Sequence, residues 1–254
     1  MAADPILTIE GLSKSFGALL ASDELNLEVA QGELHAVIGP NGAGKTTMIA
    51  QVCGQIAPDL GKITFAGRDI TQVPQQKRPG LGLVRSFQIT SIFRDYTALE
   101  NVSMAVQLGA GHSFHFFAPA AGDPLLSEPA LVCLDQVGLL AQAETEAHAL
   151  SHGQQRRLEL AMALARHPKL LVLDEPMAGM GAEETADVIA LLKTLKGKVS
   201  MLLVEHDMDA VFALADRISV LVYGQVIASG EPESIRNNQK VKEAYLGTNE
   251  VGDA

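Results

Sequence analysis

Cysteine is scarce in this chain. Of 254 residues only two are cysteine, Cys53 and Cys133, and both stand in apolar, helix-like stretches. Two isolated cysteines suggest neither the disulfide framework of a small secreted domain nor a thiolate metal site. We therefore expect both thiols to be buried in the core of a protein that works in a reducing compartment.

The chain also lacks a basic start, a long apolar run and an excess of positive charge. Residues 1–5 contain no lysine or arginine, and no uninterrupted apolar run approaches the roughly 20 residues needed to span a bilayer. Acidic residues outnumber basic ones, 30 to 19, for a net charge of -11, which repels nucleic-acid phosphates and anionic lipids. We expect a cytoplasmic chain without a nucleic-acid partner that associates with a membrane only through another protein.

What the chain does have is enough apolar material for a full core. Hydrophobic residues make up 47% of it, and the length favours one elaborated domain over two independent ones. Short apolar and polar alternations predict half-exposed antiparallel strands at residues 6–16, 25–29 and 63–65. Residues 97–166 are mostly helical in pattern, interrupted by a stretch rich in Gly, Pro and Phe at 109–129 that we expect to be an inserted loop.

The second half of the chain alternates between strand and helix patterns. Residues 170–173 and 200–204 predict buried strands, and residues 183–195 between them predict a helix. Residues 218–222 and 226–228 flank a short turn and predict a hairpin. Such alternation implies an α/β fold with a parallel sheet flanked by helices.

A phosphate-binding pattern lies near the start of the chain. Residues 39–46 fit GxxxxGK(S/T) and follow an apolar run at 34–38 that predicts a buried strand. Closely spaced glycines let backbone N–H groups point at phosphate oxygens, while Lys45 brings a positive charge and the Thr46 hydroxyl can bind Mg²⁺. The alternative is a glycine-rich turn with a chance Lys-Thr pair.

Two adjacent carboxylates end the strand predicted at residues 170–173. Asp174 and Glu175 lie where that strand reaches the carboxyl edge of the sheet, which is where nucleotides bind in open α/β folds. Asp174 can hold the hydration shell of Mg²⁺, and Glu175 can orient or polarise the water that attacks a terminal phosphate. A solvated acidic turn is the alternative.

A capped helix is predicted between these two motifs. Ser151 and Gln154 form a capping-box pattern, and apolar residues follow at helical spacing up to the stop at Pro168. The free N–H groups and dipole of this helix make a second anion site, separate from residues 39–46. On the cap alone, an ordinary helix start is the better interpretation.

The sequence of this cap, Leu150-Ser-His-Gly-Gln-Gln155, resembles the LSGGQ signature of ATP-binding cassette (ABC) proteins, and it stands just upstream of the Asp-Glu strand, as in that family. His152 occupies the place of the first glycine. The resemblance covers nearly the whole chain and implies an ABC ATPase fold: a P-loop NTPase-type mixed sheet core, an antiparallel β subdomain and a helical insert. We expect a single ABC ATP-binding domain, with residues 1–87 and 167–254 as the core and 88–166 as the helical subdomain.

The resemblance also implies roles for residues that mean little alone. Gln88 is similar to the glutamine that links Mg²⁺ and the attacking water to the helical insert, which docks on a membrane partner; His206 is similar to the histidine that contacts the terminal phosphate. Phe16 stands where the family stacks an aromatic ring on adenine. Residues 178–181 occupy the D-loop position but lack its usual aspartate.

These assignments give a complete set of expected site residues. The catalytic residues are Glu175, His206 and Gln88, and the Mg²⁺ residues are Thr46, Gln88 and Asp174. The ATP-binding residues are Gly39, Pro40, Asn41, Gly42, Ala43, Gly44, Lys45, Thr46, Thr47 and Phe16. Ser151, Gly153 and Gln154 are expected to contact the ATP of a second subunit, because two cassettes of this family pack head to tail.

Three further stretches, at residues 82–102, 177–184 and 223–247, resemble the ATP-binding subunit of bacterial branched-chain amino acid importers, as does the insert at 109–129. That resemblance implies ATP and Mg²⁺ as cofactors. It implies as partners a second ATP-binding subunit, identical or different, integral membrane permeases and, indirectly, a solute-binding protein.

Other functions remain open at this point. A soluble cassette ATPase of DNA repair or translation usually carries two cassettes or a coiled-coil or zinc-bearing insertion, and neither is visible in the sequence. A P-loop kinase would have no reason to combine the Ser151 helix with Glu175 and His206. His112 and His115 could suggest a metal site, but without a nearby Cys or acidic residue they are better interpreted as surface residues.

Overall fold

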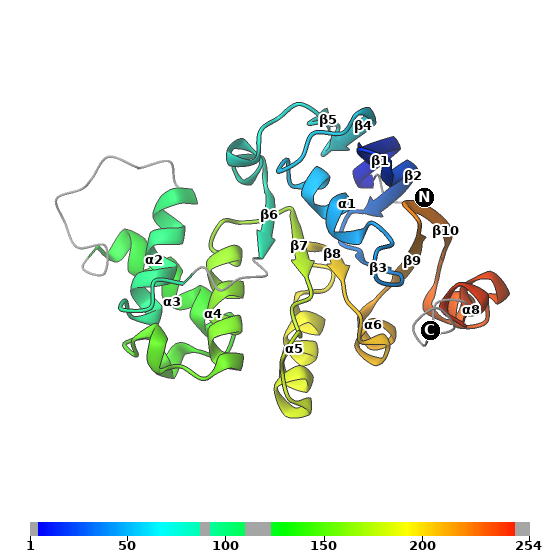
Figure 1. Cartoon of the computed structure of the whole chain (residues 1–254). Helices are drawn as coiled ribbons and strands as arrows, with labels where there is room; N and C mark the ends of the chain where they lie inside the picture. Colours follow the sequence, from blue (N-terminus) through cyan, green and yellow to red (C-terminus); the bar gives the residue numbers. More distant parts are fainter. Residues whose placement is uncertain (1–4, 87–91, 110–122, 247–254) are drawn as a thin grey trace.

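The computed structural model describes residues 5–86, 92–109 and 123–246 of the chain (Figure 1). Within these residues the strands form two sheets, one of four strands in the order β2-β1-β4-β5 and one of six in the order β10-β9-β3-β8-β7-β6. The strands are β1 Pro5–Phe16, β2 Leu19–Ala30, β3 Leu34–Ile38, β4 Leu60–Phe65, β5 Arg68–Asp69, β6 Leu83–Ser86, β7 Leu170–Asp174, β8 Ser200–Val204, β9 Arg217–Val222 and β10 Gln225–Gly230.

The four-stranded sheet is antiparallel, as the alternating pattern predicts. Strand β1 pairs with β2 on one side and with β4 on the other, so that Ile9 stands opposite both Leu27 and Ile63. These three side chains are buried against helix α1 in one apolar cluster. The prediction of antiparallel strands before and after the phosphate-binding pattern is confirmed.

The six-stranded sheet is mixed. Strands β3, β6, β7, β8 and β9 run parallel, and β10 closes the sheet as the antiparallel partner of β9. All residues of β3, β7 and β8 are buried, because helices cover both faces of a parallel sheet and leave no polar side. The predicted strands at 170–173 and 200–204 and the predicted hairpin are therefore confirmed.

Eight α-helices surround the sheets in the described residues. They are α1 Lys45–Val52, α2 Ala98–Gly109, α3 Pro124–Gln136, α4 His152–Leu164, α5 Ala182–Leu195, α6 Met208–Leu214, α7 Pro232–Arg236 and α8 Gln239–Leu246. Figure 1 shows α2, α3 and α4 grouped beside the edge strand β6, whereas α5 and α6 lie against the sheet further along. The helix predicted at 183–195 is confirmed as α5.

The inserted loop ends earlier than the sequence pattern suggests. We expect a loop up to residue 129, but α3 already begins at Pro124, and Pro129 lies inside it. Asp123 caps this helix by accepting a hydrogen bond from the Leu125 amide, and proline is well suited to the first helical position that follows. The predicted boundary at residue 129 was wrong, because the composition typical of a loop extends into the first turns of a helix that begins with proline. Residues 110–122 lie outside the described part.

A single arginine ties the four-stranded sheet to helix α1. Arg78 is 2% exposed and its guanidinium donates hydrogen bonds to the carbonyls of Gln51 and Val52, in the last turn of α1, and to those of Ile70 and Val73. A cation at a helix C-terminus complements the helix dipole, and here it also adds a donor to two carbonyls of the last turn, of which that of Gln51 also accepts from the Gly54 amide.

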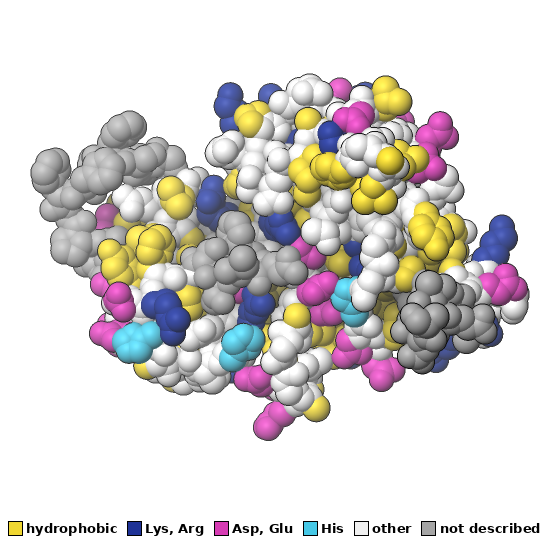
Figure 2. All heavy atoms as spheres, viewed as in Figure 1, with side chains coloured by type: hydrophobic (Ala, Val, Ile, Leu, Met, Phe, Trp, Pro, Cys, Tyr) yellow, Lys and Arg dark blue, Asp and Glu magenta, His cyan; other side chains and the backbone are white. Residues whose placement is uncertain are grey.

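The expectation that both cysteines are buried is confirmed. Cys53 and Cys133 are free and buried, and burial raises the pKa of the Cys53 thiol to about 12. No described helix combines the length and the apolar character that crossing a bilayer requires. On the face drawn in Figure 2, acidic and basic side chains are interspersed. The negative net charge of the chain is therefore not gathered in one large acidic patch on that face.

Candidate functional site

The phosphate-binding pattern forms the turn between β3 and α1. Gly44, just before the helix, has φ of 102°, and a Cβ at this position would come within 2.3 Å of the Ala21 carbonyl oxygen. Only glycine tolerates both the left-handed backbone and this close approach. The first turn of α1 therefore begins directly at Lys45, with Thr46 exposed at the mouth of the loop and Thr47 half-buried.

Lys45 folds back over its own loop. Its Nζ donates to the carbonyl oxygens of Gly39, at 2.6 Å, and Pro40, at 3.0 Å, and the side chain is almost fully buried. Burial lowers the pKa of Lys45, and the nearby carboxylates of Glu175 and Asp174 oppose that shift. The ammonium group is therefore held inside the loop by neutral acceptors, close to two negative charges.

Asp174 lies at the carboxyl end of β7, as its position in the sequence predicts. Its side chain is 2% exposed, and Oδ2 accepts a hydrogen bond from Arg85 Nη2 at 2.5 Å. The other arm of this guanidinium, Nη1, donates to Gln55 Oε1 at 2.7 Å, just after α1. Sequence reasoning missed Arg85 as a partner of the acid. A charged residue on the strand next to β7 was the available signal, but its use required knowing that β6 pairs with β7.

Glu175 and His206 meet although 31 positions separate them. His206 Nε2 lies 2.7 Å from Glu175 Oε1 and donates to it, with both side chains partly exposed. Glu175 has φ of 49°, an uncommon left-handed conformation for a residue other than glycine, and its backbone N–H donates to the carbonyl of Val204 at the end of β8. The structure thus brings together the two residues expected to act on the terminal phosphate.

The turn that carries His206 is fixed by its buried neighbour. Glu205 is 4% exposed, and its carboxylate accepts hydrogen bonds from the backbone N–H groups of Met177 and His206. The loop after β7 and the loop after β8 are therefore tied to each other. Sequence reasoning gave Glu205 no role, because its two partners are backbone groups that no residue pattern reveals.

The start of helix α4 has the predicted capping box. Ser151 Oγ accepts from the Gln154 amide at 3.3 Å, and Gln154 Oε1 accepts from the Ser151 amide at 2.9 Å. The amide of Gly153 donates to Glu184 Oε1 in α5 at 3.1 Å. No hydrogen bond within the described residues joins this helix start to residues 39–46, so the two anion sites of one chain are separate.

Of the two other expected site residues, the structure describes Phe16 but not Gln88. Phe16 ends β1 with its side chain 48% exposed, and Lys14 Nζ lies 5.7 Å from the centre of its ring. An aromatic face is therefore available to a flat ligand. Gln88 lies outside the described residues, as do His112 and His115.

The oxygen donors at this edge of the sheet suit Mg²⁺ bound together with a nucleotide. Thr46 offers an exposed hydroxyl and Asp174 a carboxylate, both hard ligands of the kind that Mg²⁺ prefers. In the described ranges, no group of three or more His, Cys, Asp or Glu residues is close enough to hold a metal ion. Mg²⁺ typically takes one or two protein ligands and completes its shell with water and phosphate oxygens, so the donor set fits.

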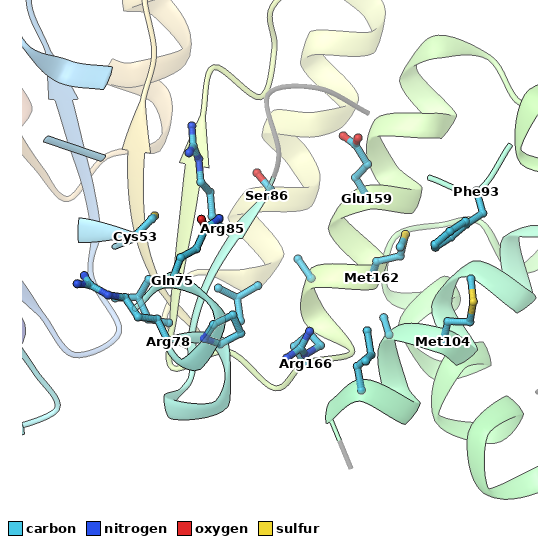
Figure 3. A pocket seen from close by; sticks show the side chains of 16 residues that line it. Cys53, Gln75, Arg78, Arg85, Ser86, Phe93, Met104, Glu159, Met162 and Arg166 are labelled. Atoms are coloured by element: carbon cyan, nitrogen blue, oxygen red, sulfur yellow. The ribbon is translucent and has the colours of Figure 1, made fainter. Parts of the chain in front are cut away.

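A pocket of about 320 Å³ opens between the parallel sheet and the helical group (Figure 3). Cys53, Arg78 and Arg85 line it from the side of the sheet, and Met104, Met162 and Arg166 from helices α2 and α4 and the turn after α4. Most of its lining is apolar, with arginine side chains at its edge. Arg85 therefore belongs both to this pocket and to the Asp174 ion pair.

Comparison with known protein families gives two matches. Residues 22–178 match the family model described as "ABC transporter", which is more than half of the chain. Residues 225–251 match the model described as "Branched-chain amino acid ATP-binding cassette transporter". The first match includes the phosphate loop, the start of α4 and both carboxylates, and the second includes β10 and the C-terminal helices.

Individual relatives match the chain over nearly its whole length. The high-affinity branched-chain amino acid transport ATP-binding protein LivG of Salmonella typhimurium is 39% identical over 96% of this chain and 99% of its own. The corresponding protein BraF of Pseudomonas aeruginosa is 40% identical over 96% of this chain and 98% of its own.

Solved structures give the same fold. The ADP conformation of MJ1267, an ATP-binding cassette of an ABC transporter, has a TM-score of 0.84 and 30% identity over 96% of this chain and 99% of that one. A dimeric post-hydrolysis structure of the cassette MJ0796 bound to ADP and phosphate has a TM-score of 0.73 and 25% identity, over 89% of this chain and 98% of that one.

Proposed function

The chain belongs to the ABC transporter family, and on this basis we propose that it is the ATP-hydrolysing subunit of an importer for branched-chain amino acids or related small solutes. The relatives named above are branched-chain amino acid transport ATP-binding proteins. The match of residues 225–251 to the branched-chain amino acid model disfavours a soluble, non-transport cassette ATPase.

The observation that carries the proposed chemistry is the contact between Glu175 and His206 beside the phosphate loop. Residues 39–47 would hold the triphosphate with backbone N–H groups and Lys45, while Phe16 stacks on the base. Glu175 then accepts a proton from the attacking water, and His206 orients its carboxylate and contacts the terminal phosphate. Gln88 is assigned the link between this water and the helical group.

Thr46 and Asp174 would hold Mg²⁺, Asp174 through water, with Gln88 as a third residue. When bound, Mg²⁺ neutralises charge that develops on the phosphate oxygens. Because Arg85 already occupies Oδ2 of Asp174, the guanidinium fixes the rotamer of this carboxylate and leaves Oδ1 for the hydration shell.

The complete site needs a second subunit. Ser151, Gly153 and Gln154 begin a helix whose dipole and amides favour an anion, yet in one chain they are not joined to the phosphate loop. We assign them to the ATP held by a partner subunit, identical or different. Nucleotide bound between two subunits would then favour closure, and loss of the terminal phosphate would favour opening.

The pocket between β6 and α4 is the proposed docking site for a cytoplasmic segment of a permease. It lies between the proposed core, residues 1–87 and 167–254, and the proposed helical subdomain, residues 88–166. An apolar lining with arginines at the edge suits an amphipathic peptide segment. In this arrangement the subunit is peripheral on the inner face of the membrane, and a solute-binding protein acts only through the permeases.

Glu175→Gln tests the catalytic assignment. The variant should bind ATP normally, lose at least about 100-fold in turnover because the general base is gone, and form an ATP-dependent dimer. ATP binding, phosphate release and sedimentation would be measured on the same protein. Glu28→Gln, an equal change of charge on an exposed strand position, is the control. Full ATPase activity in Glu175→Gln would remove Glu175 from its role.

Uptake of radiolabelled leucine tests the transport assignment. Cells that lack the gene should lose high-affinity uptake, which the wild-type gene restores and Glu175→Gln does not. Undiminished uptake in cells lacking the gene would contradict the proposed solute class, while leaving the ATPase assignment to be judged on the purified protein.

A further inference from the structure

One carboxylate bridges the starts of two helices at the proposed signature. Glu184, the third residue of α5, accepts a hydrogen bond from the Gly153 amide at 3.1 Å through Oε1 and from the Gly181 amide at 3.4 Å through Oε2. Gly153 lies in the first turn of α4, and Gly181 directly precedes α5. Glu184 therefore joins α4 to α5 through backbone N–H groups of both.

The contact depends on the absence of a side chain at Gly153. A Cβ at its position would lie 2.7 Å from Glu184 Oε1, closer than real Cβ atoms come, and 3.0 Å from Cδ, so the carboxylate could not stay where it is. The neighbouring amide, that of Gln154, already donates to Ser151 Oγ. Two of the amides at the start of α4 thus have acceptors from their own chain, and one of those acceptors is negatively charged.

We propose that Glu184 is an internal stand-in for the partner's terminal phosphate, and that it must leave the Gly153 amide before two subunits can close over ATP. This inference rests on the proposed function, in which Ser151 and Gly153 contact the partner's nucleotide. It adds a regulatory contact to that site: the open subunit inhibits its own signature with a carboxylate.

The physical reason is competition between two anions for one positive helix end. The N–H groups and dipole at the start of α4 stabilise a single negative group, and a second one brought to the same place is repelled. A triphosphate carries more charge than a carboxylate and presents more acceptor oxygens, so it can displace Glu184. The displaced side chain keeps the Gly181 amide as a donor and can reach water, because Glu184 is half-buried.

The exchange also has a mechanical consequence for the subunit. The Glu184 contact holds α4, in the helical group, against α5, beside the sheet. Its release frees the start of α4 to reorient relative to α5 at the moment of closure. Closure would therefore be slower and weaker with Glu184 in place than without it.

ATP-dependent dimerisation in the Glu175→Gln background tests the proposal. Sedimentation equilibrium at a series of protein concentrations, with Mg²⁺ and saturating ATP, gives the dimer dissociation constant. Glu184→Ala should lower that constant about fivefold, because the competing charge and acceptor are both removed. Glu184→Gln removes the charge and one of the two accepting oxygens but keeps the other, so it should lower the constant by a smaller factor.

Glu183→Gln is the matched control, since Glu183 is the exposed neighbour in the same first turn of α5. It makes the same charge change without touching Gly153, and the dimer constant should stay that of the background. Thermal unfolding of each monomer without nucleotide shows whether α5 remains intact, and Glu184→Gln, which keeps one acceptor oxygen, carries the test if Glu184→Ala proves unstable.

The outcomes separate the inference from the function on which it rests. Tighter dimers for Glu184→Gln but not for Glu183→Gln support the stand-in role. An unchanged or weaker dimer for both Glu184 variants, in a background that does dimerise with ATP, overturns that role and leaves the proposed function standing. Failure of Glu175→Gln itself to dimerise with ATP overturns the composite site and the inference together.

Discussion

The phosphate loop and the start of helix α4 are the two proposed anion sites, and in each the groups expected to bind the anion already have hydrogen-bond partners. The partners are of opposite kinds. In the loop a cation, Lys45, rests on neutral carbonyls of Gly39 and Pro40. At the helix start an anion, Glu184, rests on a backbone amide. In the proposed function, an arriving nucleotide would attract the lysine away from these carbonyls but would have to displace the carboxylate. From this difference we expect an order in which ATP binds to the loop first and closure by a second subunit follows.

Of the substitutions that test this comparison, Lys45→Ala should have the largest effect, a loss of ATP affinity at the phosphate loop. Removal of charge-assisted hydrogen bonds to phosphate should weaken ATP binding by the single subunit about 100-fold, as measured by calorimetry. Lys196→Ala, which removes a lysine paired with Asp216 outside the site, is the control and should leave affinity unchanged. Wild-type ATP affinity in Lys45→Ala would contradict the loop as the primary site.

Phe16→Ala should have an intermediate effect on nucleotide affinity, and only ligands that carry a base should be affected. Loss of aromatic stacking should weaken ATP binding about tenfold and leave the binding of magnesium pyrophosphate unchanged. Phe16→Tyr, which keeps the ring, should bind ATP normally. Leu60→Ala, which shortens another exposed apolar side chain of the same sheet, should also be neutral. Equal losses for ATP and pyrophosphate would show that Phe16 does not act by stacking on the base.

Ser151→Ala should have the smallest effect on the free subunit. Loss of the cap should lower the free energy of unfolding by about 1 kcal/mol and leave ATP binding to the loop unchanged, while ATP-dependent dimerisation falls by more than the loss of stability explains. Asp123→Ala removes a cap from α3 away from the signature, and it should lower stability without affecting the dimer. Equal dimerisation defects in both variants would favour an ordinary helix cap at Ser151.

Local patterns were sufficient to predict much of the fold. The buried strand before the phosphate loop, the strand at 200–204 and the capping box at Ser151 depend on residues within a few positions of one another, and the structure contains all of them. The start of α3 was equally local, because Asp123 followed by Pro124 is a helix-start pattern. The prediction missed it because the composition of residues 109–129 was taken as a whole to indicate a loop.

The contacts that complete the site could not be predicted in this way. Arg85 and Asp174 are 89 positions apart, and Gly153 and Glu184 are 31 apart. Each pair depends on which strands or helices become neighbours, and a single sequence does not specify that. Asp174 and Gly153 were expected as site residues from their motifs, whereas Arg85 and Glu184 lie in stretches whose resemblance to a family gave them no individual role.

Through Arg78, helix α1 connects the phosphate loop with the pocket between the sheet and the helices. Arg78 donates to the last carbonyls of α1 and is also one of the residues that line the pocket proposed for the permease, while the first residues of the same helix are Lys45 and Thr46. Eight helical residues span about 12 Å, so the helix is a short, stiff rod. A displacement of the pocket wall would then shift Lys45 and Thr46, the two side chains that we propose to hold the nucleotide. The proposed contact with the permease and the proposed contact with ATP would then lie at opposite ends of one helix.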